Sequence, residues 1–223
     1  MTLFAIVAYC PLVKRITKIS DSAVRRLSHY LRFLDEFEAA GEPTVSSETL
    51  AERGGITSAQ VRKDLSHFGS FGKRGMGYPV AVLRQRIVEI LGLGGTWRVA
   101  LVGAGKLGAA LFLYAGFRRQ GFDIVAVLDN DPAKIGRRWG DVMVEDVADL
   151  PRVVEREKVE LAIVATPAAA AQEVVDALVA ARVRAILNFG PRKLHVPPEV
   201  TLRDVNLTIE MESLTFALTQ KGR

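Results

Sequence analysis

The chain has 223 residues, of which 49% are hydrophobic and 25% charged, with a formal net charge of +5. This length fits two domains with separate cores, and this balance of residues excludes a disordered chain. The first 97 residues hold 13 Lys and Arg against 9 Asp and Glu, whereas the remainder holds 17 against 16. This asymmetry suggests a nucleic-acid-binding surface, although a basic solvated face without a partner explains the charge equally well.

Residues 1–17 are predicted to form an extension before the first domain. Their apolar run is followed by basic residues and has no small-residue cleavage site, unlike a signal peptide, and it is shorter than the roughly 20 residues that cross a bilayer. Cys10 is the single cysteine and cannot form an internal disulfide, which favours a reducing, cytoplasmic setting. We therefore expect no membrane partner.

A long amphipathic helix is predicted next, capped by Ser20 or Ser22 and ended by Gly41 with Pro43. Spacings of three and four place seven residues on its apolar face: Ala23, Val24, Leu27, Tyr30, Leu31, Leu34 and Phe37. We expect this face to pack in the core of the first domain.

Two shorter helices follow. The first can be capped by Ser46 or Ser47 and stops at Gly54–Gly55, and the second opens with Thr57 and Gln60 at the spacing of a capping box. Helix, tight glycine turn and helix is the helix-turn-helix arrangement of DNA-binding proteins.

The second of these helices is predicted to enter the major groove. Val61, Leu65 and Phe68 recur at i, i+4 and i+7 and are expected to face the core. The other side offers donors for base edges and phosphates: Ser58, Gln60, Arg62, Lys63, Ser66 and His67. A charged helix face is often only solvated, so this face alone is weak support for DNA binding.

A glycine-rich turn strengthens that interpretation. A short hairpin is predicted between Phe71 and Tyr78, with Lys73 and Arg74 at its tip, where they can reach phosphates or a minor groove. The segment 18–80 is therefore predicted to be a winged-helix domain, followed by a linker helix and loop. That linker covers 81–96, and the three histidines show no metal-ligand spacing, so we expect no metal.

The second domain, predicted over 97–206, begins with a buried strand that ends in the glycine pattern of dinucleotide-binding proteins. Gly103 makes the tight turn, Gly105 lets the backbone approach a pyrophosphate, and Gly108 allows close packing of helix on strand. The amino terminus of the next helix faces the phosphates. The whole loop is predicted to bind the cofactor: Gly103, Ala104, Gly105, Lys106, Leu107 and Gly108.

The next strand ends at Asp129, 21 residues beyond Gly108, where this pattern places an acid on the ribose hydroxyls. An acid disfavours a 2′-phosphate, so NAD(H) is favoured over NADP(H), although Lys134 and the Arg137–Arg138 pair weaken the preference. The alternative is that Asp129 is only the acid of a turn.

Further alternation of strands and helices predicts a doubly wound parallel sheet. Thr166, Pro167, Asn188 and Phe189 follow strands at the sheet edge where such folds bind ligands, and we predict that they contact the cofactor. The segment 207–223 is predicted to be an apolar terminal helix that buries itself on its own domain or on a second subunit.

Together these residues resemble the Rex family of redox-sensing transcriptional repressors. The matching stretches are "RRLSHYLRFL", "VSSETLAERGGITSAQVRKDLSHFGSFGKRGMGY", "VGAGKLG", "AILNFGP" and "LTIEMESLTFAL". The resemblance implies an α/β chain with a winged-helix domain, a Rossmann-like domain and a terminal helix swapped into the partner. It also implies a homodimer that binds palindromic operator DNA when NADH is scarce and leaves it when NADH binds.

In that resemblance, Arg32 and Tyr114 match positions that contact the partner's terminal segment. The family usually carries an acid where this chain has Asn206, so the electrostatic part of the switch is weakened unless Asp204 substitutes.

Two other functions compete with this one. An NAD-dependent oxidoreductase would need a substrate domain, for which too little chain follows the glycine motif, and no histidine or lysine pairs with an acid to act on a substrate. A CoA-binding or nucleotide-binding regulatory module does not explain the winged helix. We therefore predict a regulator and not an enzyme.

Overall fold

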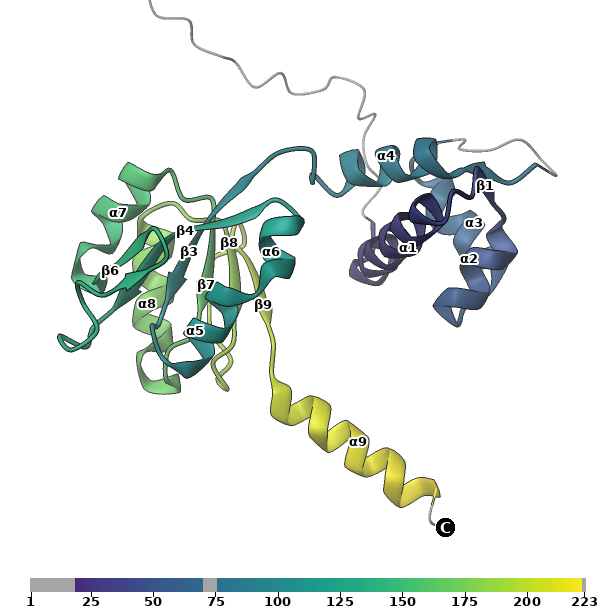
Figure 1. Ribbon diagram of the computed structural model, residues 1–223. Helices are drawn as coiled ribbons and strands as arrows, with labels where there is room; N and C mark the ends of the chain where they lie inside the picture. Colours follow the sequence, from purple (N-terminus) through teal and green to yellow (C-terminus); the bar gives the residue numbers. More distant parts are fainter. Residues whose placement is uncertain (1–18, 70–75, 222–223) are drawn as a thin grey trace, which may run out of the picture. The chain divides into compact units, whose positions relative to one another are not determined.

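The computed structural model describes residues 19–69 and 76–221, and the chain divides into two compact units, Met1–Gly94 and Gly95–Arg223 (Figure 1). The extension 1–17 with Cys10, and the predicted wing-tip residues Lys73 and Arg74, lie outside the described residues.

The described residues of the amino-terminal unit form four helices and a small antiparallel sheet. The helices are α1 (Asp21–Ala39), α2 (Ser47–Gly54), α3 (Ser58–Ser66) and α4 (Val80–Ile90), and the strands are β1 (Thr44–Val45) and β2 (Tyr78–Pro79). The predicted caps form: Ser20 accepts from the amide of Ala23, Ser46 from Thr49, and Thr57 from Gln60.

The core of this unit includes the predicted face of α1, with one exception. Leu27, Tyr30 and Leu34 are at most 1% exposed, whereas Val24 is 41% exposed and lies beside the packed stripe. The helix α4, which the sequence assigned to a linker, adds Val80, Leu83 and Ile87 to the same core. It is therefore an integral part of the amino-terminal unit.

The sequence did not reveal β1, the strand that pairs with the end of the predicted wing. Val45 lies opposite Tyr78 in this pairing. Gly77 has φ +71°, and a Cβ there would lie 2.7 Å from the carbonyl oxygen of Val45, so the turn into β2 requires glycine.

The carboxy-terminal unit is built on one seven-stranded sheet of order β5-β6-β4-β3-β7-β8-β9. Its strands are β3 (Trp97–Val102), β4 (Phe122–Asp129), β5 (Arg138–Trp139), β6 (Val142–Asp146), β7 (Leu161–Val164), β8 (Ala185–Asn188) and β9 (Thr201–Asp204). All neighbouring strands run parallel except β5, which is antiparallel to β6. This order is the doubly wound arrangement of dinucleotide-binding folds.

Helices cover the two faces of the sheet unequally. They are α5 (Lys106–Leu113), α6 (Ala115–Arg119), η1 (Val147–Asp149), α7 (Leu150–Glu157) and α8 (Ala168–Ala180). A further helix, α9 (Leu207–Lys221), follows β9 and extends away from the sheet (Figure 1). Side chains of α7 and α8 pack with Ala100 and Val102 on one face. Leu111, Phe112 and Phe117 of α5 and α6 pack with Val99 and Leu101 on the other.

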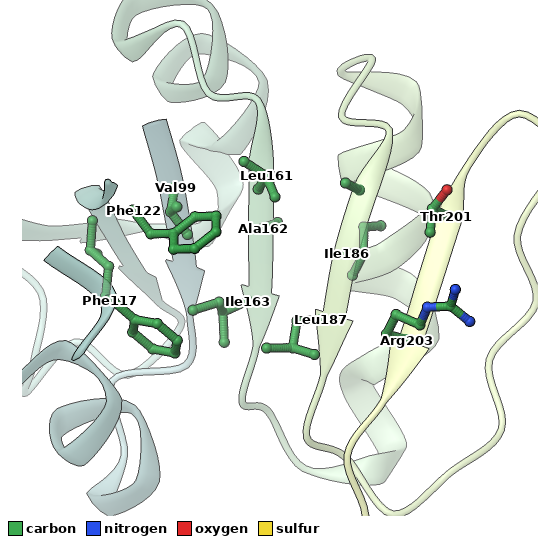
Figure 2. Close-up of a pocket in the computed structure, with 12 residues that line it drawn as sticks. Val99, Phe117, Phe122, Leu161, Ala162, Ile163, Ile186, Leu187, Thr201 and Arg203 are labelled. Carbon is green, nitrogen blue, oxygen red and sulfur yellow. The ribbon is translucent and has the colours of Figure 1, made fainter. Parts of the chain in front are cut away.

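An apolar pocket of about 270 Å³ remains on the α6 side of β7, β8 and β9 (Figure 2). Right-handed crossovers place the helices of the two halves of such a sheet on opposite faces, so α8 lies on the far side of these strands. Val99, Phe117, Ile163 and Leu187 line the pocket, with Arg203 at its edge.

Candidate functional site

The predicted reading helix α3 is fixed to α1 by a buried carboxylate. Asp64 is 1% exposed and accepts hydrogen bonds from Nε and Nη2 of Arg26, at 2.6 and 2.8 Å, from the hydroxyl of Tyr30 at 2.9 Å, and from Nε2 of Gln60 at 2.8 Å. The sequence analysis missed Asp64, because its position between Val61 and Leu65 in the apolar pattern gives no sign of a polar partner.

These contacts keep Asp64 ionised. Burial tends to raise the pKa of Asp64, but the hydrogen bonds from Arg26, Tyr30 and Gln60 outweigh that effect and hold it below its ordinary value. Burial, followed by the hydrogen bond to Asp64, raises the pKa of Tyr30. The network is thus a charged carboxylate surrounded by donors.

Several other residues of the predicted reading face already have partners. Nη1 of Arg62 donates to Oγ of Ser47 at 3.0 Å and to Oε1 of Glu48 at 3.1 Å, and Oγ of Ser66 donates to the carbonyl oxygen of Lys63. Lys63 and His67 are exposed, and Ser58 is half-buried at the start of α3. Five of the six predicted residues therefore lie on α3, and the sixth, His67, is its C-cap.

The glycine loop after β3 is shaped as the sequence predicts. Gly103 has φ +108°, and a Cβ there would lie 2.6 Å from the carbonyl oxygen of Ala165. A Cβ on Gly108 would collide with the carbonyl oxygen of Gly103, whereas one on Gly105 would meet no atom within 4 Å. The space beside Gly105, at the amino terminus of α5, is open to a ligand.

Asp129 supports this loop from within. It is 7% exposed, and its carboxylate accepts from the amides of Ala104 and Asp131, at 2.7 and 2.8 Å, and lies 3.2 Å from Nζ of Lys134. Burial tends to raise the pKa of Asp129, but these partners outweigh it and lower the pKa below its ordinary value. Asp131, whose side chain is 42% exposed, is a second carboxylate that the sequence analysis did not consider for the ribose.

Thr166 and Asn188, the polar residues predicted at the ends of two strands, differ in their hydrogen bonding. The hydroxyl of Thr166 is buried and has no hydrogen-bond partner in the described part of the chain, which is unusual for a buried polar group and leaves its hydrogen-bonding capacity unused. Asn188 is fully buried, and its amide bonds to the backbone of Gly190 and Arg192 and to Oδ1 of Asp204. A direct cofactor contact does not fit this burial, because Asn188 is occupied in holding the loop after β8.

Pro167 and Phe189 complete the predicted cofactor contacts. Pro167 is exposed at the start of α8, and Phe189 is half-buried against the core on the α5 side of the sheet. Lys106 and Leu107 are exposed in the first turn of α5.

The residues assigned to the switch lie at breaks in the secondary structure or on its surface. Tyr114 is 57% exposed and lies between α5 and α6, with its ring edge-on to Phe117 at 5.2 Å. Asn206 caps α9, because its Oδ1 accepts from the amide of Thr208 at 3.0 Å and from that of Ile209 at 3.4 Å. Arg32 is exposed on α1.

No described residue of the chain covers the helix α9. Its large apolar side chains are 54% to 70% exposed, namely Leu207, Ile209, Met211, Leu214, Phe216 and Leu218. Leu207, Met211, Leu214 and Leu218 share one side at helical spacing, while Ile209 and Phe216 lie on the opposite side. A helix that is apolar on opposite sides is normally buried between two surfaces.

Within residues 19–69 and 76–221, no three His, Cys, Asp or Glu side chains are grouped as metal ligands. In the same part of the chain, no helix combines the length and apolar character of a membrane span.

Comparisons with known proteins cover both units. Residues 18–66 match the family described as "Putative DNA-binding protein N-terminus", and residues 95–192 match "CoA binding domain". The chain is 49% identical over 199 residues to the redox-sensing transcriptional repressor Rex of Carboxydothermus hydrogenoformans, covering 89% of this chain and 96% of that protein. It is 48% identical over 204 residues to the Rex of Pelotomaculum thermopropionicum, covering 92% and 96%.

Solved structures agree with the sequence relatives. A crystal structure of RSP in complex with β-NAD+ and operator DNA matches with a TM-score of 0.89 and 36% identity, over 92% of this chain and 95% of that one. RSP in complex with β-NADH matches with a TM-score of 0.84 and 34% identity, over 92% and 97%. Both matches extend over the helix-turn-helix and the doubly wound sheet.

Proposed function

Because the chain belongs to the Rex family of redox-sensing transcriptional repressors, we propose that its two units form one switch, in which the carboxy-terminal unit binds NADH and thereby releases α3 from operator DNA. The chain is a DNA-binding regulator that senses NAD(H), and the repressor names of its relatives exclude the oxidoreductase alternative. The observation that carries the proposal is the open space at Gly105, at the amino terminus of α5; the unpaired hydroxyl of Thr166, which follows β7, supports it.

The cofactor site is proposed at the carboxyl ends of β3, β4 and β7. Amides at the start of α5 would hold the pyrophosphate, with Gly105 in closest approach. Asp129 would keep the loop in place, and Asp131, more exposed, would face the ribose hydroxyls with Asp129 behind it. Bound NAD(H) supplies a redox-dependent shape and charge, and no reaction is required.

Calorimetric titration with NADH, NADPH and CoA tests this part of the proposal. The account predicts that NADH binds most tightly, since a 2′-phosphate would meet Asp129 and Asp131. Tighter binding of CoA would favour the nucleotide-binding module instead.

The DNA site is proposed on α3. Lys63 and His67 are exposed and can contact phosphates, and Arg62 can exchange Glu48 for a phosphate. Lys73 and Arg74 are proposed as the wing contacts from the sequence alone. Operator DNA is chromosomal, so we propose that the protein acts in the cytoplasm.

A homodimer is proposed, with α9 swapped onto the partner. The support is the two-sided apolar surface of α9 together with the apolar pocket beside β7, β8 and β9, which lies in the same unit of the chain (Figure 2). Two subunits would present two α3 helices to the two half-sites of a palindrome. The coupling between the cofactor and DNA sites needs about 1–3 kcal/mol, or about 5- to 150-fold in operator affinity.

Thr166→Val is expected to weaken NADH binding by about two- to tenfold, the value of one hydrogen bond. The thermal midpoint of the free protein is expected not to fall, because the hydroxyl has no partner to lose. Calorimetry for NADH and thermal unfolding without ligand give the two readouts. Unchanged NADH affinity would remove Thr166 from the site.

Asn206→Asp is expected to enlarge the drop in operator affinity caused by NADH by about two- to fivefold, because an aspartate keeps the cap of α9 and adds an exposed ion pair with the partner's Arg32. The readout is operator affinity with and without NADH. The same substitution with Arg32→Met is the control and is expected to bring no gain. An equal gain in both backgrounds would contradict the proposed pairing.

A further inference from the structure

On the side of α3 that faces α1, the carboxylate of Asp64 accepts as many hydrogen bonds as it can. An ionised carboxylate offers about four lone-pair positions, and Asp64 uses all of them. Oδ1 accepts from Nη2 of Arg26 and Nε2 of Gln60, and Oδ2 accepts from Nε of Arg26 and the hydroxyl of Tyr30. No position is left for a second orientation of these partners.

This saturation fixes the orientation of the Gln60 side chain. A carboxylate can only accept hydrogen bonds, so the amide of Gln60 must turn Nε2 toward Asp64, and its Oε1 must point away. The opposite orientation would place two oxygens against each other and leave Oδ1 one donor short. The assignment therefore depends on chemistry and not on the choice between two similar amide atoms.

Gln60 occupies a position suited to reading DNA. It lies in the first turn of α3, the half of a reading helix that contacts base edges, and it is half-buried. Its backbone amide donates to Oγ1 of Thr57 at 3.2 Å, so both its backbone and its side chain are held before DNA arrives. A side chain that is ordered in advance loses less entropy on binding.

We propose that Asp64 is a positioning residue for sequence recognition, which holds Gln60 so that Oε1 accepts a hydrogen bond from an exocyclic amine in the major groove. Such amines are N6 of adenine and N4 of cytosine; guanine and thymine present acceptors at the corresponding edge. This inference rests on the proposed DNA-binding role of α3. It adds which chemical group Gln60 reads and which buried residue sets that choice.

The experiment is selection of bound duplexes from a random-sequence library, with sequencing of the bound pool, for the full-length chain and its variants. The wild type is expected to enrich a palindrome with an adenine or cytosine at one position of each half-site that depends on Gln60. Gln60→Ala is expected to reduce the preference at that position by about five- to tenfold or more, and to leave the other positions unchanged.

Asp64→Asn is expected to weaken the base preference at the same position of the half-site. An amide at residue 64 can accept from Nε2 of Gln60 or donate to its Oε1, so it no longer fixes the orientation of Gln60. Tyr30→Phe is the matched control. It removes one hydrogen bond of Asp64 and lowers stability, but it leaves Gln60 held and is expected to keep the base preference. If Tyr30→Phe and Asp64→Asn alter the selected sequence equally, or neither alters it, Asp64 has only a structural role and the inference is overturned.

A second measurement needs no variant that could unfold. In a nuclear magnetic resonance spectrum of the wild-type chain labelled with ¹⁵N-glutamine, one Nε2 proton of Gln60 is expected to exchange slowly with water because Asp64 holds it. Rapid exchange of both protons would contradict the fixed orientation. If the wild type selects no sequence at all, the proposed DNA-binding function fails; if it selects an operator that Gln60→Ala reads identically, only this inference fails.

Discussion

Replacing Leu214 and Leu218 by aspartate is expected to convert the protein to a monomer and to lower its affinity for operator DNA by about 10²- to 10⁴-fold. The size of the effect follows from losing the second binding event, which is intramolecular in a dimer on a palindrome. Both side chains lie on the four-residue apolar stripe of α9 and are 60% and 70% exposed in the single chain. Sedimentation velocity and operator titration give the two readouts.

The reason lies in the distribution of apolar residues on α9. An isolated exposed leucine is common on protein surfaces, but a 15-residue helix with apolar side chains on opposite sides requires cover on both. Within one chain, the described residues leave the whole helix exposed. Two buried charges on the stripe would be left unpaired in the dimer, which is strongly unfavourable.

Thr215→Asp is the matched control for this experiment. It adds an acid to the same helix at a polar position between the two apolar sides, and Oγ1 of Thr215 bonds only to the carbonyl oxygen of Glu212 among the described contacts. The dimer is expected to persist. If Leu214→Asp with Leu218→Asp also remained dimeric and bound the operator normally, α9 would not form the subunit interface.

Gly105→Ala is expected to weaken NADH binding by more than about tenfold, equivalent to 1.4 kcal/mol, and to leave a repressor that stays on its operator in the presence of NADH. The added methyl group would meet no atom of the protein within 4 Å, so the free chain is expected to keep its thermal midpoint. Only a ligand that approaches the backbone at Gly105 would be obstructed.

Two neighbouring glycines serve as contrasts. Gly103→Ala is expected to destabilise the free protein, since the positive φ alone costs about 1–3 kcal/mol and its Cβ would press on Ala165. Gly108→Ala is expected to destabilise it through collision with Gly103. Thermal unfolding separates these structural glycines from the ligand-facing one. A large loss of stability in Gly105→Ala, with NADH affinity intact, would contradict the proposed site.

Much of the architecture was predictable because local signals agree with it. Ser20, Ser46 and Thr57 form caps, and the apolar pattern of α1 identifies its packed face. The spacing of Gly103, Gly105 and Gly108 identifies the loop, because each glycine meets a steric requirement at the turn itself. Comparison with known repressors confirms the fold and the function.

The features that sequence analysis missed depend on contacts between distant segments. Strand β1 has two residues and exists only through its pairing with Tyr78. The hairpin of β5 and β6 and the eight-residue helix α7 are short, so their periodic patterns carry little information. Asp64 lies within the apolar pattern of α3, and its partners Arg26 and Tyr30 come from α1, 38 and 34 residues earlier, so the local sequence does not reveal them.

Among the site residues too, contacts with distant segments are the ones that local sequence does not predict. Asn188 was predicted to touch the cofactor because it follows a strand at the correct edge, but its bonds to Gly190, Arg192 and Asp204 are set by the path of the loop after β8. Asp204 in turn accepts a hydrogen bond from Asn188. The position of Asn206 is therefore the simplest one at which to introduce the acid that the family usually carries.

Titrating NADH into a complex of the wild-type protein with its selected operator, followed by fluorescence anisotropy of the DNA, tests the central claim most directly. The account predicts that NADH releases the DNA at concentrations where NAD+ leaves the complex largely intact, with operator affinity falling by about 5- to 150-fold. Operator binding that is equally strong with and without saturating NADH would contradict it.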